Sequence, residues 1–312
     1  MPIPLRLSLR ALRAFALVVE HRSITIAARE LNTAASAVAT ALDQVESEFG
    51  ATLLIRTRSR GVAPTPEAIQ MAHRFRALLD DYAAIMDSGH SIATDLAGTL
   101  RIGYYAPVAP AFLPRILGPM MTDNPDLRLE FQEHDNDSAQ EALLAGRLDV
   151  ILFAGQNLRS GIETRVLLDL PPYVLAPQNH PVTRIPALTL TEVARYPIIQ
   201  LDLPLARPYL ERLFRSQGTR PDIVATANNT EMVRGLVGAG IGISVLAMRP
   251  ITDTTHGGDL LCTLPLHQDL PGLQLLSGCA PGRPRRLVSA FLTALHVWMD
   301  SNQARALTVS DV

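Results

Sequence analysis

Apolar side chains in the first 50 residues constrain the fold most, because they recur at helical spacing in three short runs separated by turn residues. The first run spans residues 9–20, and the second spans 24–31 after the N-cap candidate Ser23. The third spans 34–49, after a turn at Asn32. An apolar side chain every three or four residues is typical of an amphipathic helix. The sequence therefore predicts three short helices that share one core.

The third run has two faces of different chemistry. Its predicted core face consists of residues at three- and four-residue steps: Val38, Leu42, Val45 and Phe49. Small and polar side chains form the opposite face, which would let the helix enter the major groove of DNA and reach base edges. The predicted DNA-reading residues are Thr33, Ala35, Ser36, Ala39, Thr40 and Asp43.

Three arginines at alternate positions, Arg56, Arg58 and Arg60, follow a short predicted strand at residues 53–55. A two-residue period places their guanidinium groups on one side of a hairpin, where a wing contacts phosphates. Residues 1–62 carry eight arginines and five acids, whereas the rest of the chain carries twenty arginines and twenty-five acids. Alternate arginines alone are common on solvated strands. In this order, however, helix, turn, helix and basic hairpin predict a winged helix-turn-helix over residues 1–65, with double-stranded DNA as its partner.

A longer helix is predicted to begin with Thr65 as N-cap and Pro66 at its first position, and to reach about residue 88. Its apolar positions step by three or four residues, close to a heptad seam: Ile69, Ala72, Phe75, Leu79, Tyr82 and Met86. Such a seam pairs two helices in a dimer, although the same face could instead pack on the helix's own domain. We assign residues 66–90 to a linker helix that dimerises.

Beyond a polar break, strands alternate with helices, which indicates an α/β domain with a mainly parallel sheet. Strands are expected at residues 100–104, 127–133, 150–153, 173–176, 198–201, 223–226, 241–246 and 273–277, and helices from about 110, from about 138 and over 284–299. Residues 91–301 are assigned to this domain, and 302–312 to a flexible tail.

A set of N-terminal positions carries a family resemblance: Leu9-Arg10, Phe15, Ser23 to Leu31, Ala37-Val38, Glu46, Phe49-Gly50, Leu53-Leu54, Arg56 and Pro64 to Pro66. In order and spacing they resemble the signature of LysR-type transcriptional regulators. The resemblance implies a bacterial regulator that binds an interrupted palindrome as a dimer or tetramer and contacts RNA polymerase.

The chain departs from the family signature at three places. A Ser-Gln pair usually opens the recognition helix, where Ala34-Ala35 stands here; Ser is usual at Ala39, and Gly at Ala68. Because fewer polar groups can then reach base edges, contacts to thymine methyl groups or DNA shape are expected to carry more of the specificity.

Motifs in the second domain extend the resemblance: Gly98 to Gly103, Gly146 to Val150, His180-Pro181 and Gly240 to Ser244. They resemble LysR effector domains, which look like periplasmic binding proteins. The resemblance implies two lobes, residues 98–170 with 271–301 and residues 171–270, with a small-molecule co-inducer between them. No other cofactor and no metal are expected.

Residues that follow strand ends are the candidates for the effector pocket, because ligands bind at the carboxyl ends of strands in open sheets. They are Tyr104, Tyr105, Ala106, Pro107, Asp202, Leu203, Asn228, Asn229 and Thr230. Each could also serve only packing or capping.

Two features of these candidates bear on the effector's chemistry. Asn228 with Glu231 forms a capping-box-like helix start whose N–H groups could face an anion. Pro107 has no N–H and stands where many relatives have Ser or Thr, which weakens anion capture at that loop. The neighbouring tyrosines favour an effector with an aromatic or apolar body.

Two other protein classes are compatible with an α/β sensor fold. An exported binding protein would carry an export signal in place of residues 1–62, and an enzyme would show converging acid, base or nucleophile candidates; neither is found. Cys262 and Cys279 lack metal-ligand spacing and are expected to be buried structural thiols, with a redox pair as the alternative. No apolar run is long enough to span a bilayer, so a cytoplasmic regulator with no membrane partner is predicted.

Overall fold

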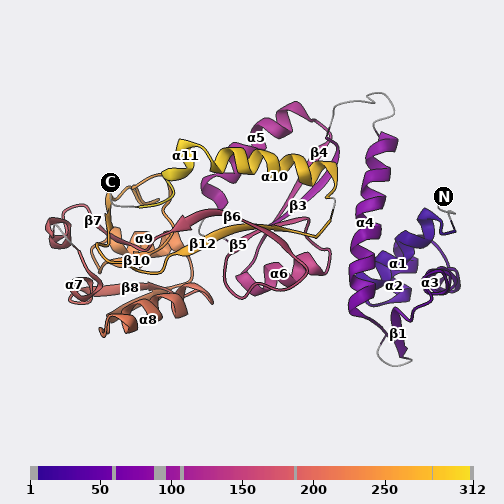
Figure 1. The fold of residues 1–312 in the computed structure, drawn as a ribbon, viewed down its shortest axis with the longest axis horizontal. Helices are drawn as coiled ribbons and strands as arrows, with labels where there is room; N and C mark the ends of the chain where they lie inside the picture. The colour runs from indigo at the N-terminus through magenta and orange to yellow at the C-terminus, as the bar shows by residue number, and fades with distance from the viewer. Residues whose placement is uncertain are drawn as a thin grey trace.

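The computed structural model describes residues 6–57, 61–87, 96–105, 109–185, 188–282 and 284–309. An N-terminal head (residues 6–64) is joined by a long helix to a larger α/β domain (Figure 1). The head contains α1 (Leu9–His21), α2 (Ile24–Glu30), α3 (Ala35–Phe49) and an antiparallel hairpin of β1 (Leu54–Thr57) and β2 (Gly61–Pro64).

Local signals set the boundaries of the head's helices. Ser8 Oγ accepts a hydrogen bond from Ala11 N at 3.1 Å, and Ser23 Oγ accepts one from Ile26 N at 3.3 Å. Arg22 and Asn32 adopt left-handed backbone conformations with φ of 52° and 48°, which turn the chain between helices. The three predicted helices are confirmed.

The apolar faces of these helices meet in one buried core, which includes Phe15, Val18, Ala27, Val38, Leu42, Val45, Leu53 and Val62. Phe49, also predicted to lie in this core, is 51% exposed. It sits at the end of α3, where its ring lies 6.1 Å from that of Phe75.

Helix α4 (Pro66–Asp87) starts where the sequence predicts, because Thr65 Oγ1 accepts a hydrogen bond from Ala68 N at 3.2 Å. Its first half packs on the head: Ala72 is fully buried, and the Phe75 ring meets the Phe15 ring edge-on at 5.6 Å. Ala72 therefore packs on the helix's own domain, and Ile69 and Phe75 lie partly buried against the same core. Pairing of two chains through this seam stays a prediction. Farther along, Leu78 and Tyr82 are exposed; the side chain of Met86 lies outside the described residues.

Lobe I (residues 98–170 and 271–309) is built on a five-stranded sheet. Its strands are, in order, β4 (Leu127–Glu133), β3 (Gly98–Tyr104), β5 (Val150–Ala154), β12 (Leu273–Cys279) and β6 (Glu163–Leu170). Its helices are α5 (Leu113–Asp123), which follows the short turn η1 (Ala109–Ala111), α6 (Asn136–Leu144), α10 (Arg286–Met299) and α11 (Asn302–Arg305).

Lobe II (residues 171–270) contains two smaller sheets. One has the order β10 (Ser244–Leu246), β7 (Tyr173–Pro177), β11 (Leu261–Pro265), and the other pairs β8 (Pro197–Leu201) with β9 (Asp222–Ala227). Its helical segments are η2 (Pro181–Arg184), α7 (Leu190–Val193), α8 (Ala206–Ser216) and α9 (Thr230–Gly238).

The sheets are mixed, so the prediction of a mainly parallel domain is wrong. Strand β3 runs parallel to both β4 and β5, and β8 runs parallel to β9. Strand β12 is antiparallel to β5 and β6, and β7 is antiparallel to β10 and β11. Strands β6 and β11, which supply part of this antiparallel pairing, were not predicted from the sequence.

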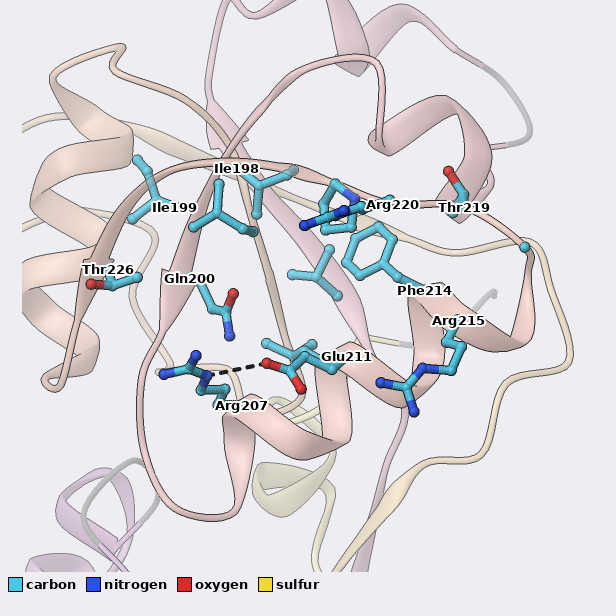
Figure 2. A pocket seen from close by; sticks show the side chains of 15 residues that line it. Ile198, Ile199, Gln200, Arg207, Glu211, Phe214, Arg215, Thr219, Arg220 and Thr226 are labelled. Carbon is cyan, nitrogen blue, oxygen red and sulfur yellow. Dashed lines mark hydrogen bonds and ion pairs between the residues drawn. The ribbon is translucent and has the colours of Figure 1, made fainter.

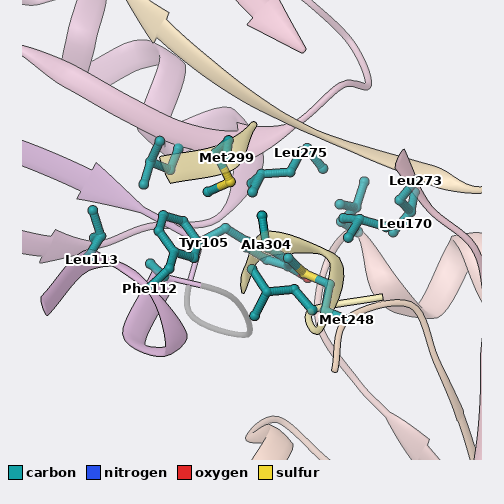
Figure 3. Packing of buried hydrophobic residues seen from close by; sticks show 14 of the residues in the cluster. Tyr105, Phe112, Leu113, Leu170, Met248, Leu273, Leu275, Met299 and Ala304 are labelled. Atoms are coloured by element: carbon teal, nitrogen blue, oxygen red, sulfur yellow. The ribbon is translucent and has the colours of Figure 1, made fainter. Parts of the chain in front are cut away.

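One hydrophobic core runs through both lobes and includes part of the predicted tail. In Figure 3, Tyr105 and Leu273 of lobe I lie near Met248 of lobe II, with Ala304 beside them. Ala304 is fully buried and Leu307 is 1% exposed. The prediction of a flexible tail from residue 302 is therefore wrong for residues 302–309, which pack on the domain.

Candidate DNA-binding surface and interlobe cleft

The face of α3 predicted to read DNA is open to solvent. Ala35, Ser36, Thr40 and Asp43 are exposed, and Thr33 and Ala39 are half-buried. The Thr40 hydroxyl donates a hydrogen bond to Ser36 O at 3.0 Å. This face presents mainly small side chains, so it can approach a groove closely.

An exposed arginine on α1 adjoins the start of α3 and was not among the predicted site residues. Arg10 Nη2 donates a hydrogen bond to Thr33 Oγ1 at 3.2 Å. Its sequence signal was its place in the basic N-terminal segment. A guanidinium at this exposed position is suited to contact a phosphate group.

Arg56 lies on the wing strand β1 but is held against α3. Its Nη2 contacts Asp43 Oδ1 at 2.6 Å and Glu46 Oε2 at 3.0 Å. Glu46 Oε1 also accepts hydrogen bonds from Leu53 N and Leu54 N at 2.7 and 2.9 Å. Arg56 thus fixes β1 to α3 and offsets the charge of Asp43. Arg58 and Arg60 lie outside the described residues.

A small cavity of about 30 Å³ lies between the lobes. Two predicted pocket residues, Tyr105 of lobe I and Thr230 of lobe II, line it together with Leu201, Ala206, Tyr209, Leu210, Val245, Leu246, Ala247, Met248 and Leu273. Such a volume holds about one water molecule, whereas ligand pockets occupy roughly 300–1,000 Å³. The cavity is therefore too small for a ligand of ordinary size.

The two tyrosines after β3 have different surroundings. Tyr105 is 6% exposed, and burial raises the pKa of its phenol, with the nearby Asp135 carboxylate adding to the effect. Tyr104 is half-buried, and its ring meets that of Phe131 edge-on at 6.4 Å. Ala106 and Pro107 lie outside the described residues.

The remaining predicted pocket residues serve local structure. Asp202 Oδ1 contacts Arg207 Nη1 at 3.4 Å, and Leu203 packs against the hydrophobic core. Asn229, not Asn228, caps α9: its Oδ1 accepts hydrogen bonds from Glu231 N and Met232 N at 2.8 and 3.1 Å.

The capping-box interpretation at Asn228 is therefore wrong. The Glu231 carboxylate instead contacts Arg234 Nε at 2.9 Å and accepts a hydrogen bond from His256 N at 2.6 Å. Two of the first N–H groups of α9 already donate to the Asn229 side chain. They are therefore less available to bind an anionic effector.

A contact between the lobes that was not predicted joins Gln156, just after β5, to Arg212 on α8. Arg212 Nη2 donates a hydrogen bond to Gln156 Oε1 at 3.3 Å. Gln156 follows the end of β5, so the strand-end rule could have identified it. Nearby, Asp135 caps α6, and the backbone N–H of Ser138 is the main reason why the pKa of its carboxyl is lowered.

A larger groove of about 630 Å³ lies on lobe II between α8 and the β8–β9 pair. Figure 2 shows Ile198, Gln200 and Phe214 along it, with an ion pair between Arg207 and Glu211 at 3.1 Å. The groove shares Leu210 and Val245 with the interlobe cavity. None of the predicted site residues that the structure describes lines it.

The two cysteines belong to different sheets. Cys262 pairs with Ala176 in lobe II, and Cys279 pairs with Val150 and Glu163 in lobe I; both are free thiols. Burial raises the pKa of each, which disfavours the reactive thiolate. In the described part of the chain, no group of three or more His, Cys, Asp or Glu side chains is arranged to hold a metal. None of the helices described there is long and apolar enough to cross a membrane.

Comparisons with known proteins agree along almost the whole chain. Residues 9–69 match the bacterial regulatory helix-turn-helix protein family called lysR, and residues 93–300 match the LysR substrate binding domain. The chain is 29% identical over 242 residues to the HTH-type transcriptional regulator AlsR of Bacillus subtilis, which covers 76% of this chain and 80% of AlsR.

Solved structures give the same picture. The crystal structure of HinK, a LysR family transcriptional regulator from Pseudomonas aeruginosa, is similar with a TM-score of 0.60 and 25% identity, covering 94% of this chain and 98% of HinK. A full-length OxyR variant from Pseudomonas aeruginosa has a TM-score of 0.67 at 19% identity, covering 98% of this chain and 99% of OxyR, which supports the fold alone.

Proposed function

The chain belongs to the LysR family of bacterial transcriptional regulators, and from this premise we propose that it binds an interrupted-palindrome operator as a dimer or tetramer and contacts RNA polymerase there. It is a ligand-responsive, DNA-binding regulator. The proposal gives α3 the role of groove reader, and Arg10 and the wing the role of phosphate contacts.

Exposed apolar side chains on α4 support pairing of two chains. Leu78 and Tyr82 are 49% and 44% exposed, four residues apart on one helix face. A two-fold pair of such helices would hold two heads in symmetric positions, which is why the expected operator is palindromic.

We further propose that a small-molecule co-inducer binds between the lobes. The observation that carries this proposal is the cavity bounded by Tyr105 from lobe I and Thr230 from lobe II. Its other walls are mostly aliphatic, so the expected effector has an apolar or aromatic body, with few polar groups to meet these hydroxyls. Because the cavity is small, binding requires the lobes to open.

DNA binding is tested on the intergenic DNA upstream of the chain's own gene, by fluorescence anisotropy across a salt series. We expect specific binding that weakens with salt, and in Arg10→Ala a slope of log K against log salt that is smaller by about 0.9, because one phosphate contact is lost. Arg215→Ala is the matched control, because it removes an exposed arginine of lobe II. Equal slopes for all three proteins would refute the role of Arg10.

The effector site is tested with a panel of small aromatic and aliphatic acids and amides, by calorimetry on the full chain. Thr230→Val keeps the shape of the side chain but removes its hydroxyl, and we expect it to weaken binding of any hit about tenfold, the loss of about one hydrogen bond. Thr226→Val is the control, because Thr226 lines the groove outside the cleft. Equal weakening by both variants, or by neither, would argue against the cleft.

A further inference from the structure

A single arginine joins three parts of the chain that are distant in sequence. Arg76 on α4 donates a hydrogen bond from Nη1 to Gly146 O at 2.8 Å, and its Nη2 contacts Glu20 Oε2 on α1 at 2.9 Å. Its side chain is only 18% exposed. One guanidinium therefore connects the DNA-binding head, the linker helix and lobe I.

Gly146 allows α4 and lobe I to approach closely. It follows the end of α6 with φ of 69°, and a Cβ atom there would lie 2.6 Å from His73 Cβ on α4. A carbonyl just beyond a helix C-terminus carries partial negative charge, which favours a cation such as Arg76. Both the backbone conformation and the close contact disfavour any larger residue at position 146.

A second ionic contact lies one turn farther along α4. Asp80 Oδ2 accepts hydrogen bonds from Arg101 Nη1 at 3.2 Å and from Arg285 Nη1 at 3.4 Å. Arg285 Nη2 also contacts Asp149 Oδ1 at 2.7 Å, and these two side chains are 7% and 9% exposed. Figure 1 shows α4 lying alongside lobe I near α6. The linker helix is thus docked on lobe I at two points.

The opposite end of α6 is tied to the interlobe contact. Asn136, 6% exposed, donates a hydrogen bond to Gln156 O at 2.7 Å and accepts one from Ala154 N at 2.9 Å. The side chain of the same Gln156 accepts the hydrogen bond from Arg212 of lobe II. Helix α6, nine residues or about 13 Å long, therefore spans the distance between the cleft and the linker helix.

We propose that Arg76 is a positioning residue that fixes the DNA-binding head on lobe I through the C-terminal end of α6, so that a change at the Arg212–Gln156 contact alters the head's orientation. This inference rests on the proposed function, in which opening of the lobes is the signal. The cleft and the head are coupled because α6 contacts Gln156 at one end and, through Gly146, Arg76 at the other. Packed elements of this kind shift between discrete arrangements.

The test measures the distance between head and lobe I by single-molecule fluorescence transfer in the full chain, without DNA or effector. Dyes are attached at Ser47→Cys on α3 and Arg115→Cys on α5, both exposed positions, in a Cys262→Ser/Cys279→Ser background. An excess of unlabelled chain ensures that only distances within one chain are seen.

In Arg76→Ala we expect loss of the single defined distance, whereas Arg74→Ala, an exposed neighbour on the same helix, keeps it. Glu20→Gln keeps the side-chain shape but removes the charge, and it should also broaden the distribution of head-to-lobe distances. Circular dichroism identifies any variant that fails to fold, and Glu20→Gln then decides the outcome. An unchanged distribution in the folded variants would overturn the positioning role.

The coupling is tested by combining variants. Arg212→Ala is expected to shift the distance when Arg76 is present and to leave it unshifted in Arg76→Ala. An equal shift in both backgrounds, or no shift in either, would overturn the coupling. The distances are measured without operator or effector, whereas the proposed function is tested by DNA binding and calorimetry, so the two can fail separately.

Discussion

The DNA-binding head and the interlobe cleft hold their site residues in opposite ways. In the head, the predicted reading face lies on one helix whose other face is buried through Val38, Leu42 and Val45, so the site is preformed. In the cleft, Tyr105 and Thr230 are distant in sequence, and the cavity between them holds only about 30 Å³. The predicted reading face of the head is already exposed, whereas the proposed effector site in the cleft has little room for a ligand.

The largest expected effect tests whether the head is a rigid, preformed unit. Leu42→Ala removes a fully buried side chain from α3, and we expect it to lower the free energy of unfolding of the head by about 2–5 kcal/mol. Thr40→Ala on the exposed face should change it by less than about 0.5 kcal/mol. Thermal unfolding followed by circular dichroism measures both. Similar losses for the two variants would show that the head is not organised around this core.

The next effect concerns how the wing is held on α3. Glu46→Ala leaves Leu53 N and Leu54 N without their acceptor and removes one of the two carboxylates that contact Arg56, so we expect a loss of about 1–3 kcal/mol in stability together with weaker operator binding. Glu48→Ala is the matched control, since Glu48 makes a long contact of 3.7 Å to Arg6, and the substitution should cost about 0–1 kcal/mol. Chemical denaturation and anisotropy provide the two measurements. If Glu46→Ala left the DNA affinity unchanged, the contacts that hold the wing on α3 would not be needed for DNA binding.

The sequence predicts the head better than the cleft for a physical reason. Helix periods, the caps Ser23 and Thr65 and the turn at Asn32 are local signals, and they gave α1 to α4 within one or two residues. Long-range contacts were harder to foresee. Phe75 completes the core by meeting Phe15, which the heptad spacing alone could not distinguish from a dimer seam.

Strand pairing and the contacts at the sites were also hard to predict, because they too depend on residues distant in sequence. Strand β6 begins with three polar residues and most of it is exposed, and its place is set by pairing with β12 more than a hundred residues away. Of the seven predicted pocket residues that the structure describes, Tyr105 and Thr230 line the cavity. The Arg56 ion pairs and the Arg212–Gln156 contact depend on side-chain directions across elements, which a periodic pattern does not specify.

A smaller effect tests how firmly the cleft is closed. The Tyr209 hydroxyl on α8 donates a hydrogen bond to Pro271 O at 2.8 Å, where the chain passes between the lobes. Tyr209→Phe should lower the free energy of unfolding by about 0.5–1.5 kcal/mol and speed amide hydrogen exchange around residues 270–275. Tyr82→Phe, on the exposed part of α4, should do neither. Unaltered exchange in Tyr209→Phe would indicate that the lobes are held closed by apolar packing alone.

The smallest effect is a pH dependence at the docking contact between α4 and lobe I. Burial lowers the pKa of His73, the Arg76 and Arg285 guanidinium groups lower it further, and the Asp149 carboxylate and the Gly146 backbone partly oppose this. Because the folded state favours the neutral imidazole, the unfolded chain binds more protons in weak acid, and stability is lost as the pH falls below the ordinary histidine value. Urea denaturation between about pH 7.5 and 5.5 should show this loss in the wild type and a smaller one in His73→Asn, which cannot titrate at this position. If both proteins lose stability equally, protonation of His73 does not act on the docked helix, and the contact between head and sensor depends on Arg76 and Asp80 without regulation by pH.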